Sequence, residues 1–197
     1  MELRGVVQPD VPLLVVALAE EAAGLDDTFP VLVTGVGKLR AATAVTGLLL
    51  QAGAPSVVIN IGTAGALRPG LTGIHEIASV LQHDFDDATF YDLLGQHFGA
   101  PLLLGESRDY DAPLPSPVLA TGDRFIAGGR ERTALAKRAD LVDMEGYAVV
   151  AACRGLRVPV RVVKLVSDDA DEDAATTWAD SLADHAHTLA AWVTQHL

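Results

Sequence analysis

At 197 residues, half of them hydrophobic, the chain is long enough to bury a sizeable core and predicts one domain spanning residues 1–197. Its apolar residues are mainly Ala, Val and Leu, and aromatic residues make up only 5%. This composition is typical of α/β proteins, in which valine-rich strands pack against Ala- and Leu-rich helices. The net charge of −12 and the pI near 4.7 argue against nucleic acid or an anionic membrane as a partner, because binding to phosphates requires a cationic face.

The single cysteine, Cys153, excludes an internal disulfide and a cysteine-based zinc cluster. It falls in an apolar, Ala-rich segment where a small buried thiol is common, so we assign it no role. The N-terminus lacks the basic and apolar regions of a secretory signal, and no apolar run reaches membrane-spanning length. We therefore expect a cytoplasmic protein.

The first half of the chain predicts a parallel crossover unit. Short apolar runs predict strands at 12–18, 29–34 and 56–61, and a longer apolar segment that ends near Pro55 predicts a helix at 37–53. A strand, a helix and a strand in that order form such a crossover. The small residues 62–66 follow directly. Because ligands gather at the carboxyl ends of parallel strands, this loop is a candidate wall of a site.

The second half continues the alternation. It predicts a strand or strand pair at 73–82, strands at 118–121, 140–144 and 160–166, and helices at 129–137, 145–156 and 174–197. Residues 88–116 show no clear period and predict mainly loop, with room for one short helix. The order indicates an α/β fold, a single three-layer domain whose central twisted mixed sheet is flanked by helices on both faces.

Carboxylate side chains stand beside the predicted strands at three places. Glu20 and Glu21 follow the first strand, Asp143 and Glu145 precede a helix, and Asp168 follows the last strand. Cleavage of a glycosidic bond needs such a set, because one carboxyl group protonates the leaving group while another activates water on the opposite face of the sugar. Each acid taken alone is more simply explained as a helix cap or first-turn residue, so only the whole set favours catalysis.

Five segments resemble the successive motifs of the 5′-methylthioadenosine/S-adenosylhomocysteine nucleosidases, members of the nucleoside phosphorylase superfamily. They are TGVGK at 34–38, VINIGTAG at 58–65, TGDRFI at 121–126, VDMEG at 142–146 and VSDDAD at 166–171. The last two together are specific, whereas the turn at 35–37 alone is a weak signal and matches neither a Walker motif nor a complete dinucleotide fingerprint. The resemblance runs in the right order from about residue 14 to the C-terminus.

This resemblance implies an N-ribosyl hydrolase that releases adenine and the modified ribose from a 5′-substituted adenosine, with no cofactor. Asp168 would be the general acid at adenine N7, oriented by Ser167. Glu21 would activate the attacking water, and Glu145 would hold the ribose hydroxyl groups.

The resemblance also implies six further substrate contacts. These are Thr63 (usually serine in the family) near the water and the sugar, Phe125 stacked on adenine, the Ile126 backbone at the adenine edge, Met144 under the ribose, and Leu18 and Val36 in the pocket for the 5′ substituent. In the family, the segment around residues 83–87 contributes to the 5′ pocket of the neighbouring subunit, which implies a homodimer. A metal site in that segment is the less favoured interpretation, because one histidine with loop aspartates is more often polar surface.

Position 60 bears on the choice between hydrolysis and phosphorolysis. The phosphorylases of this superfamily usually carry an arginine there to bind phosphate, since a dianion favours a bidentate cation. Asn60 therefore favours water as the nucleophile, and Arg40 is interpreted as a solvated helix residue. Lys164, in contrast to Asn60, departs from the nucleosidase pattern. It stands where the nucleosidases commonly have an arginine that organises the water, and a lysine cannot reproduce the planar fork.

Other functions remain open at this stage. The chain is short for the family between Glu21 and Pro30 and between Asp87 and Val118, which leaves the 5′ substituent undetermined. The alternatives within the enzyme class are a futalosine-type hydrolase and a purine phosphorylase. A catalytically silent nucleoside-binding protein is the alternative from another class, although such a protein has little need of all three acids.

Overall fold

The computed structural model describes residues 1–105 and 116–197. Within these residues, ten strands form one mixed sheet in the order β1-β3-β2-β4-β9-β8-β6-β7, with β10 beside β4 and β5 beside β10. The strands are β1 (Glu2–Arg4), β2 (Leu13–Val16), β3 (Val31–Val33), β4 (Val58–Ala66), β5 (Ile74–Glu76), β6 (Ser79–Gln82), β7 (Leu102–Leu103), β8 (Val118–Thr121), β9 (Leu141–Asp143) and β10 (Val160–Asp168).

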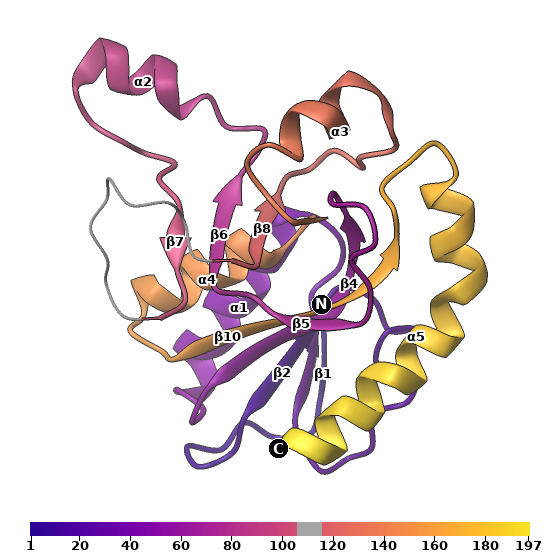
Figure 1. Cartoon of the computed structure of the whole chain (residues 1–197). Helices are drawn as coiled ribbons and strands as arrows, with labels where there is room; N and C mark the ends of the chain where they lie inside the picture. The colour runs from indigo at the N-terminus through magenta and orange to yellow at the C-terminus, as the bar shows by residue number, and fades with distance from the viewer. Residues whose placement is uncertain (106–115) are drawn as a thin grey trace.

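Helices cover both faces of this sheet (Figure 1). They are α1 (Lys38–Ala52), α2 (Asp87–Leu94), α3 (Gly129–Leu135), α4 (Gly146–Gly155) and α5 (Ala174–His196). α1 and α4 pack together on one face, and α5 lies on the other. The three-layer α/β fold predicted from the sequence is confirmed.

The side chains of β2 show how the two cores arise. Leu13 and Val15 pack with the α1 and α4 side chains, whereas Leu14 and Val16 pack with side chains of α5. Successive side chains of a strand point to opposite faces, so a strand covered on both sides must be apolar throughout. This explains why β2 is an unbroken run of buried apolar residues.

The segment 62–66, predicted as a loop, instead continues β4 as far as Ala66. Gly62 pairs with Lys164 of β10, and Gly65 pairs with both Asp168 of β10 and Val142 of β9. These two neighbours satisfy the backbone hydrogen-bonding groups, which overrides the weak intrinsic preference of glycine for a strand. The predicted wall of the site is therefore rigid sheet rather than loop.

Three other elements differ from the prediction. β1 was not predicted, and it pairs antiparallel with β3 at the sheet edge. The segment 73–82 forms two strands that do not pair with each other, because β5 joins β10 and β6 joins β8. In the expected loop, α2 and β7 form within the described part, and residues 106–115 lie outside the described residues.

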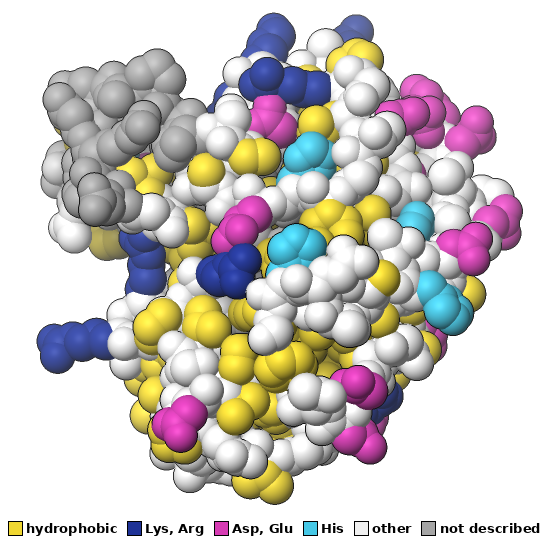
Figure 2. Space-filling view, turned by 60° about the horizontal axis from the view of Figure 1, so that its bottom comes forward, with side chains coloured by type: hydrophobic (Ala, Val, Ile, Leu, Met, Phe, Trp, Pro, Cys, Tyr) yellow, Lys and Arg dark blue, Asp and Glu magenta, His cyan; other side chains and the backbone are white. Residues whose placement is uncertain are grey.

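On the face shown in Figure 2, acidic side chains are scattered and the Lys and Arg side chains lie in separate small groups. α2 projects from the body of the fold and buries none of its residues within the chain (Figure 1). Among the helices of the described residues, none combines the length and the apolar character required to cross a membrane.

Candidate active site

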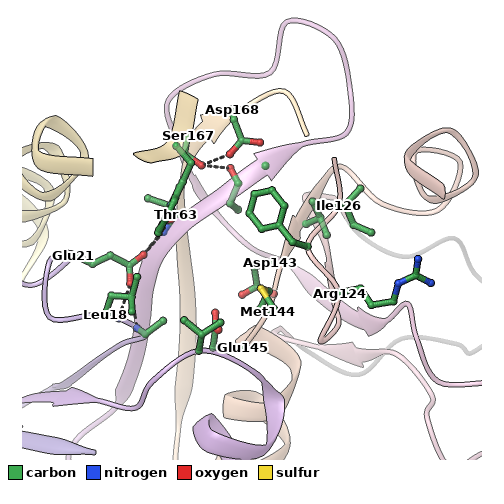
Figure 3. A pocket seen from close by; sticks show the side chains of 17 residues that line it. Leu18, Glu21, Thr63, Arg124, Ile126, Asp143, Met144, Glu145, Ser167 and Asp168 are labelled. Atoms are coloured by element: carbon green, nitrogen blue, oxygen red, sulfur yellow. Dashed lines mark hydrogen bonds between the residues drawn. The ribbon is translucent and has the colours of Figure 1, made fainter. Parts of the chain in front are cut away.

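A cavity of about 280 Å³ opens where β2, β4, β9 and β10 end. All ten residues predicted for the site line this one cavity, namely Leu18, Glu21, Val36, Thr63, Phe125, Ile126, Met144, Glu145, Ser167 and Asp168. Seven others that were assigned no contact also line it, namely Ala17, Ala64, Gly65, Arg124, Val142, Asp143 and Trp178. Figure 3 shows Ser167 and Asp168 at one end of the cavity, Glu145 at the other, and Glu21 with Thr63 along one side.

The end of β10 places two adjacent polar side chains in this cavity. The pairing with β4 shifts register between Val166 and Asp168, and such a bulge re-aims side chains that would otherwise alternate. The Ser167 hydroxyl donates to Asp168 Oδ2 at 2.7 Å, and the Ala170 N–H donates to Oδ1 at 2.8 Å. A Cβ at Gly65 would lie 2.9 Å from Oδ1, so glycine is needed for this close approach. The carboxyl group of Asp168 is thus held in one orientation.

Glu21 is buried in the turn after β2, with 4% of its surface exposed. Its Oε2 accepts from the N–H groups of Ala17 and Leu18, both at 3.1 Å. Its Oε1 accepts from the Thr63 N–H at 3.0 Å and from the Thr63 hydroxyl at 3.1 Å. A Cβ at Gly62 would lie 2.9 Å from Oε1, so the glycine of β4 makes room for this carboxylate.

The two acids of the VDMEG segment, Asp143 and Glu145, have different surroundings. Asp143 Oδ2 accepts from the Gly146 N–H in the first turn of α4, while Oδ1 accepts from the Thr121 hydroxyl at 2.6 Å. Glu145 occupies the N-cap position of α4 without a capping side-chain bond, and its Oε1 accepts from the Gly37 N–H at 2.8 Å instead. The capping interpretation therefore applies to Asp143, and Glu145 faces the cavity.

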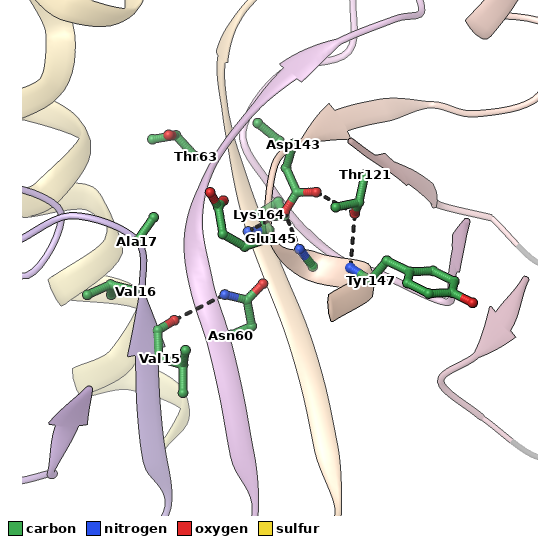
Figure 4. Close-up of polar contacts among 12 residues, drawn as sticks. Val15, Val16, Ala17, Asn60, Thr63, Thr121, Asp143, Glu145, Tyr147 and Lys164 are labelled. Carbon is green, nitrogen blue, oxygen red and sulfur yellow. Dashed lines mark hydrogen bonds and ion pairs between the residues drawn. The ribbon is translucent and has the colours of Figure 1, made fainter. Parts of the chain in front are cut away.

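Lys164 lies beneath the cavity and forms a buried ion pair with Asp143, with Nζ 2.9 Å from Oδ2 (Figure 4). Burial alone would lower the pKa of Lys164, but the carboxylates of Asp143, Glu145 and Glu21 together raise it above its ordinary value. Lys164 is therefore charged. The ammonium group of Lys164 is in direct contact with Asp143.

The pKa of Glu145 is strongly raised. Burial and the neighbouring Asp143 carboxylate raise its pKa from 4.5 to about 8, although the Lys164 ammonium and the Gly37 N–H act in the other direction. One ammonium group surrounded by three buried carboxyl groups cannot balance all of them as anions. Glu145 therefore keeps its proton to a higher pH than an ordinary glutamic acid.

Asn60 is buried on β4, and its Nδ2 donates to the Val15 carbonyl at 3.2 Å. Its Oδ1 has no hydrogen-bond partner among the described residues. Asn60 does not line the cavity. Position 60 therefore contributes no positive charge to the cavity.

The polar segment beyond β6 has structural partners. Lys38 Nζ donates to Asp84 at 2.5 Å, and Asp86 accepts from the Thr89 N–H at the start of α2. Among the described residues, no cluster of three or more His, Cys, Asp or Glu side chains could hold a metal ion.

Gly35 and Gly37 have positive φ angles of 86° and 101°, in keeping with the predicted tight turn.

Trp178 of α5 lines the cavity and was missed because it falls in the first turns of a helix that the sequence predicts only as a closing element. Its Nε1–H donates to the Thr63 hydroxyl at 3.1 Å. One signal was available, since Trp178 is one of only two tryptophans and follows the VSDDAD segment closely.

The raised pKa of Glu145 predicts a pH-dependent stability. Because its pKa is about 8 in the folded chain and near 4.5 when unfolded, its contribution to stability is complete below pH 4.5 and is lost as the pH rises through 8. In urea unfolding at pH 5, 6, 7 and 8, the free energy of unfolding of the wild type should fall with rising pH by up to about 1.4 kcal/mol per pH unit through this group. Glu145→Gln should abolish that part of the pH dependence. Parallel curves for the two proteins would contradict the assignment.

The chain is similar to known proteins of one superfamily. The chain matches the family model of the phosphorylase superfamily over residues 26–196. It is 33% identical to a 5′-methylthioadenosine/S-adenosylhomocysteine nucleosidase of Actinobacillus succinogenes, over 76% of this chain and 71% of that protein. It is 29% identical to an aminodeoxyfutalosine nucleosidase of Helicobacter pylori, over 79% of this chain and 74% of that protein.

The fold is also shared with solved structures. A mutant of Helicobacter pylori MTAN with 5′-methylthioadenosine in the active site superposes with a TM-score of 0.75 at 21% identity, covering 95% of this chain and 98% of that chain. The resemblance inferred from the five motifs is confirmed. The chain belongs to the phosphorylase superfamily and, within it, to the 5′-methylthioadenosine/S-adenosylhomocysteine nucleosidase family.

Proposed function

We propose that this protein hydrolyses the N-glycosidic bond of a 5′-substituted adenosine, of the methylthioadenosine or S-adenosylhomocysteine type, and releases adenine and the modified ribose. One observation carries the proposal, namely that Asp168, Glu21 and Glu145 line the same cavity from three different strand ends. Glycoside hydrolysis requires an acid and a base on opposite sides of the scissile bond. Family membership supports the same reaction class.

Asp168 is the general acid in this proposal. Adenine leaves poorly as an anion, so a proton delivered to N7 as the C1′–N9 bond breaks allows it to depart as a neutral molecule. Ser167 orients the carboxyl group through its bond to Oδ2. Phe125 stacks on the base and the Ile126 backbone binds its edge, a role supported by the position of Phe125 at the mouth, where half of its surface is exposed.

Glu21 accepts a proton from the water that attacks C1′. Glu145 binds the ribose hydroxyl groups, and its raised pKa gives it a proton to donate to one of them. Thr63 lies beside Glu21 near the water and the sugar, and Met144 packs under the ribose. The 5′ substituent contacts Leu18 and Val36, apolar side chains that suit a thioether.

Water rather than phosphate is the nucleophile. A phosphate dianion needs a cationic clamp. Position 60 holds a buried asparagine. Lys164 does not line the cavity, and its ammonium group is paired with Asp143. Among the described lining residues, the one cation is Arg124 at the mouth, whose guanidinium pairs with Glu131.

The protein acts as a cytoplasmic homodimer in nucleoside catabolism and methionine salvage, without a cofactor. The dimer is supported by α2, which leaves large apolar side chains such as Phe90, Leu93 and Leu94 exposed. Exposed apolar patches of this kind mark protein–protein contacts. In the dimer, this region reaches the partner's 5′ pocket.

Incubation with methylthioadenosine, with and without phosphate, tests the reaction. We expect release of adenine and free methylthioribose at a rate that phosphate does not change. Turnover that requires phosphate would establish a phosphorylase instead. Tight binding without product, unaffected by Asp168→Asn, would establish a silent nucleoside-binding protein.

A futalosine-type substrate is the second candidate, favoured by the match to an aminodeoxyfutalosine nucleosidase at 29% identity. The acid, base and adenine contacts would serve both substrates, which differ at the 5′ position. The ratio of kcat/KM for aminodeoxyfutalosine to kcat/KM for methylthioadenosine decides between them.

A further inference from the structure

Three side chains from α5, β4 and the turn after β2 form a directed chain of hydrogen bonds. Trp178 Nε1 donates to Thr63 Oγ1 at 3.1 Å, and Thr63 Oγ1 donates to Glu21 Oε1 at 3.1 Å. An indole N–H only donates and a carboxylate only accepts, so the direction of both bonds is fixed. The indole N–H thus occupies one lone pair of Thr63 Oγ1 and leaves the hydroxyl hydrogen to donate to Glu21 Oε1.

The Glu21 carboxylate, which accepts the last of these hydrogen bonds, already has a donor in each lone-pair direction. Glu21 accepts four hydrogen bonds, from the N–H groups of Ala17, Leu18 and Thr63 and from the Thr63 hydroxyl. An ionised carboxylate offers about four lone-pair directions. A Glu21 that is to receive a proton from water must therefore first release one donor.

The four donors are not equally easy to release. Three are backbone amides, whose departure would require movement of the main chain of β4 or of the segment that follows β2. The fourth is the Thr63 hydroxyl, whose hydrogen can turn about the Cβ–Oγ1 bond. Because Trp178 bonds to the oxygen and not to the hydrogen, Oγ1 stays anchored while the hydrogen turns away.

We propose that Trp178 is a positioning residue of the hydrolytic reaction, which anchors Thr63 Oγ1 so that its hydrogen can swing between Glu21 and the cavity. The inference rests on the proposed function of Glu21. As the water oxygen attacks C1′, its O–H bond breaks and the proton passes to Glu21 Oε1, in the lone-pair direction that the Thr63 hydroxyl has vacated. The Trp178 indole itself exchanges no proton.

A double-mutant cycle tests this coupling. Trp178→Phe keeps the aromatic ring but removes the N–H, and should lower kcat for adenine release about tenfold with KM unchanged within about twofold. Thr63→Val should lower kcat at least as much. The double variant should be no slower than Thr63→Val alone, because the indole acts only through the hydroxyl. Trp192→Phe on the same helix is the matched control, since Trp192 stacks on His196 away from the cavity.

Additive losses in the cycle, or a Trp178→Phe variant with wild-type kcat, would overturn the inference. A wild-type protein that releases no adenine would overturn the proposed function and the inference with it, so the two failures are distinguishable.

The indole signals provide a readout that does not require turnover. The chain has two tryptophans, and their N–H resonances are assigned from the two Phe variants. Thr63→Val should move the Trp178 signal and leave that of Trp192 in place. An unmoved Trp178 signal would contradict the hydrogen bond itself.

Discussion

Asp168→Asn is expected to lower kcat for adenine release about a thousandfold while nucleoside binding changes by no more than a few fold. General acid catalysis typically contributes 10²- to 10⁴-fold, and an amide cannot deliver the proton that adenine N7 needs. The substitution preserves the size of the side chain and an oxygen for the Ala170 N–H, so the site should keep its shape. Steady-state release of adenine and isothermal titration with methylthioadenosine measure the two quantities.

The neighbouring Asp169 provides the control for this variant. It is exposed and does not line the cavity, so Asp169→Asn should keep the wild-type rate. An Asp168→Asn protein with substantial activity would show that another group protonates the base. Equal losses in both variants would show that the effect is a general one of charge in the Asp-rich turn.

Lys164→Met is expected to destabilise the fold by about 3–5 kcal/mol, because it leaves the Asp143 carboxylate buried without its counter-ion. Both side chains are almost fully buried, with 2% and 1% exposed, so water cannot replace the lost partner. For a chain of this length the melting temperature should fall by roughly 10 °C. Urea unfolding followed by circular dichroism gives the change in free energy.

A second substitution separates the loss of charge balance from the loss of packing. In the Asp143→Asn/Lys164→Met protein the anion that was in direct contact with the lost ammonium group is also removed, so more than half of the lost stability should return. If the double variant is no more stable than Lys164→Met, the ion pair is not the cause. A Lys164→Met protein that unfolds like the wild type would refute the prediction altogether.

The sequence by itself determined the fold class and the membership of the site. Glu21, Glu145 and Asp168 each stand next to a short apolar run, and such runs are recognisable from local pattern alone. β2, β4 and β10 are parallel, so the residues that follow β2 and β10 lie at the same edge of the sheet, whereas β9, which precedes Glu145, runs antiparallel to β4. The other predicted site residues came from the resemblance to the nucleosidase motifs, and all ten line one cavity although they are scattered along the chain.

Only the tertiary structure decided how these residues are supported. The glycine-rich end of β4 is sheet because β9 and β10 pair with it, which no local preference of residues 62–66 reveals. The partner of Lys164 lies on β9, the four donors of Glu21 lie after β2 and in β4, and the place of Trp178 depends on how α5 packs on the sheet. The bond from Trp178 to Thr63 spans 115 residues of sequence, a separation at which spacing and periodicity carry no information about contact.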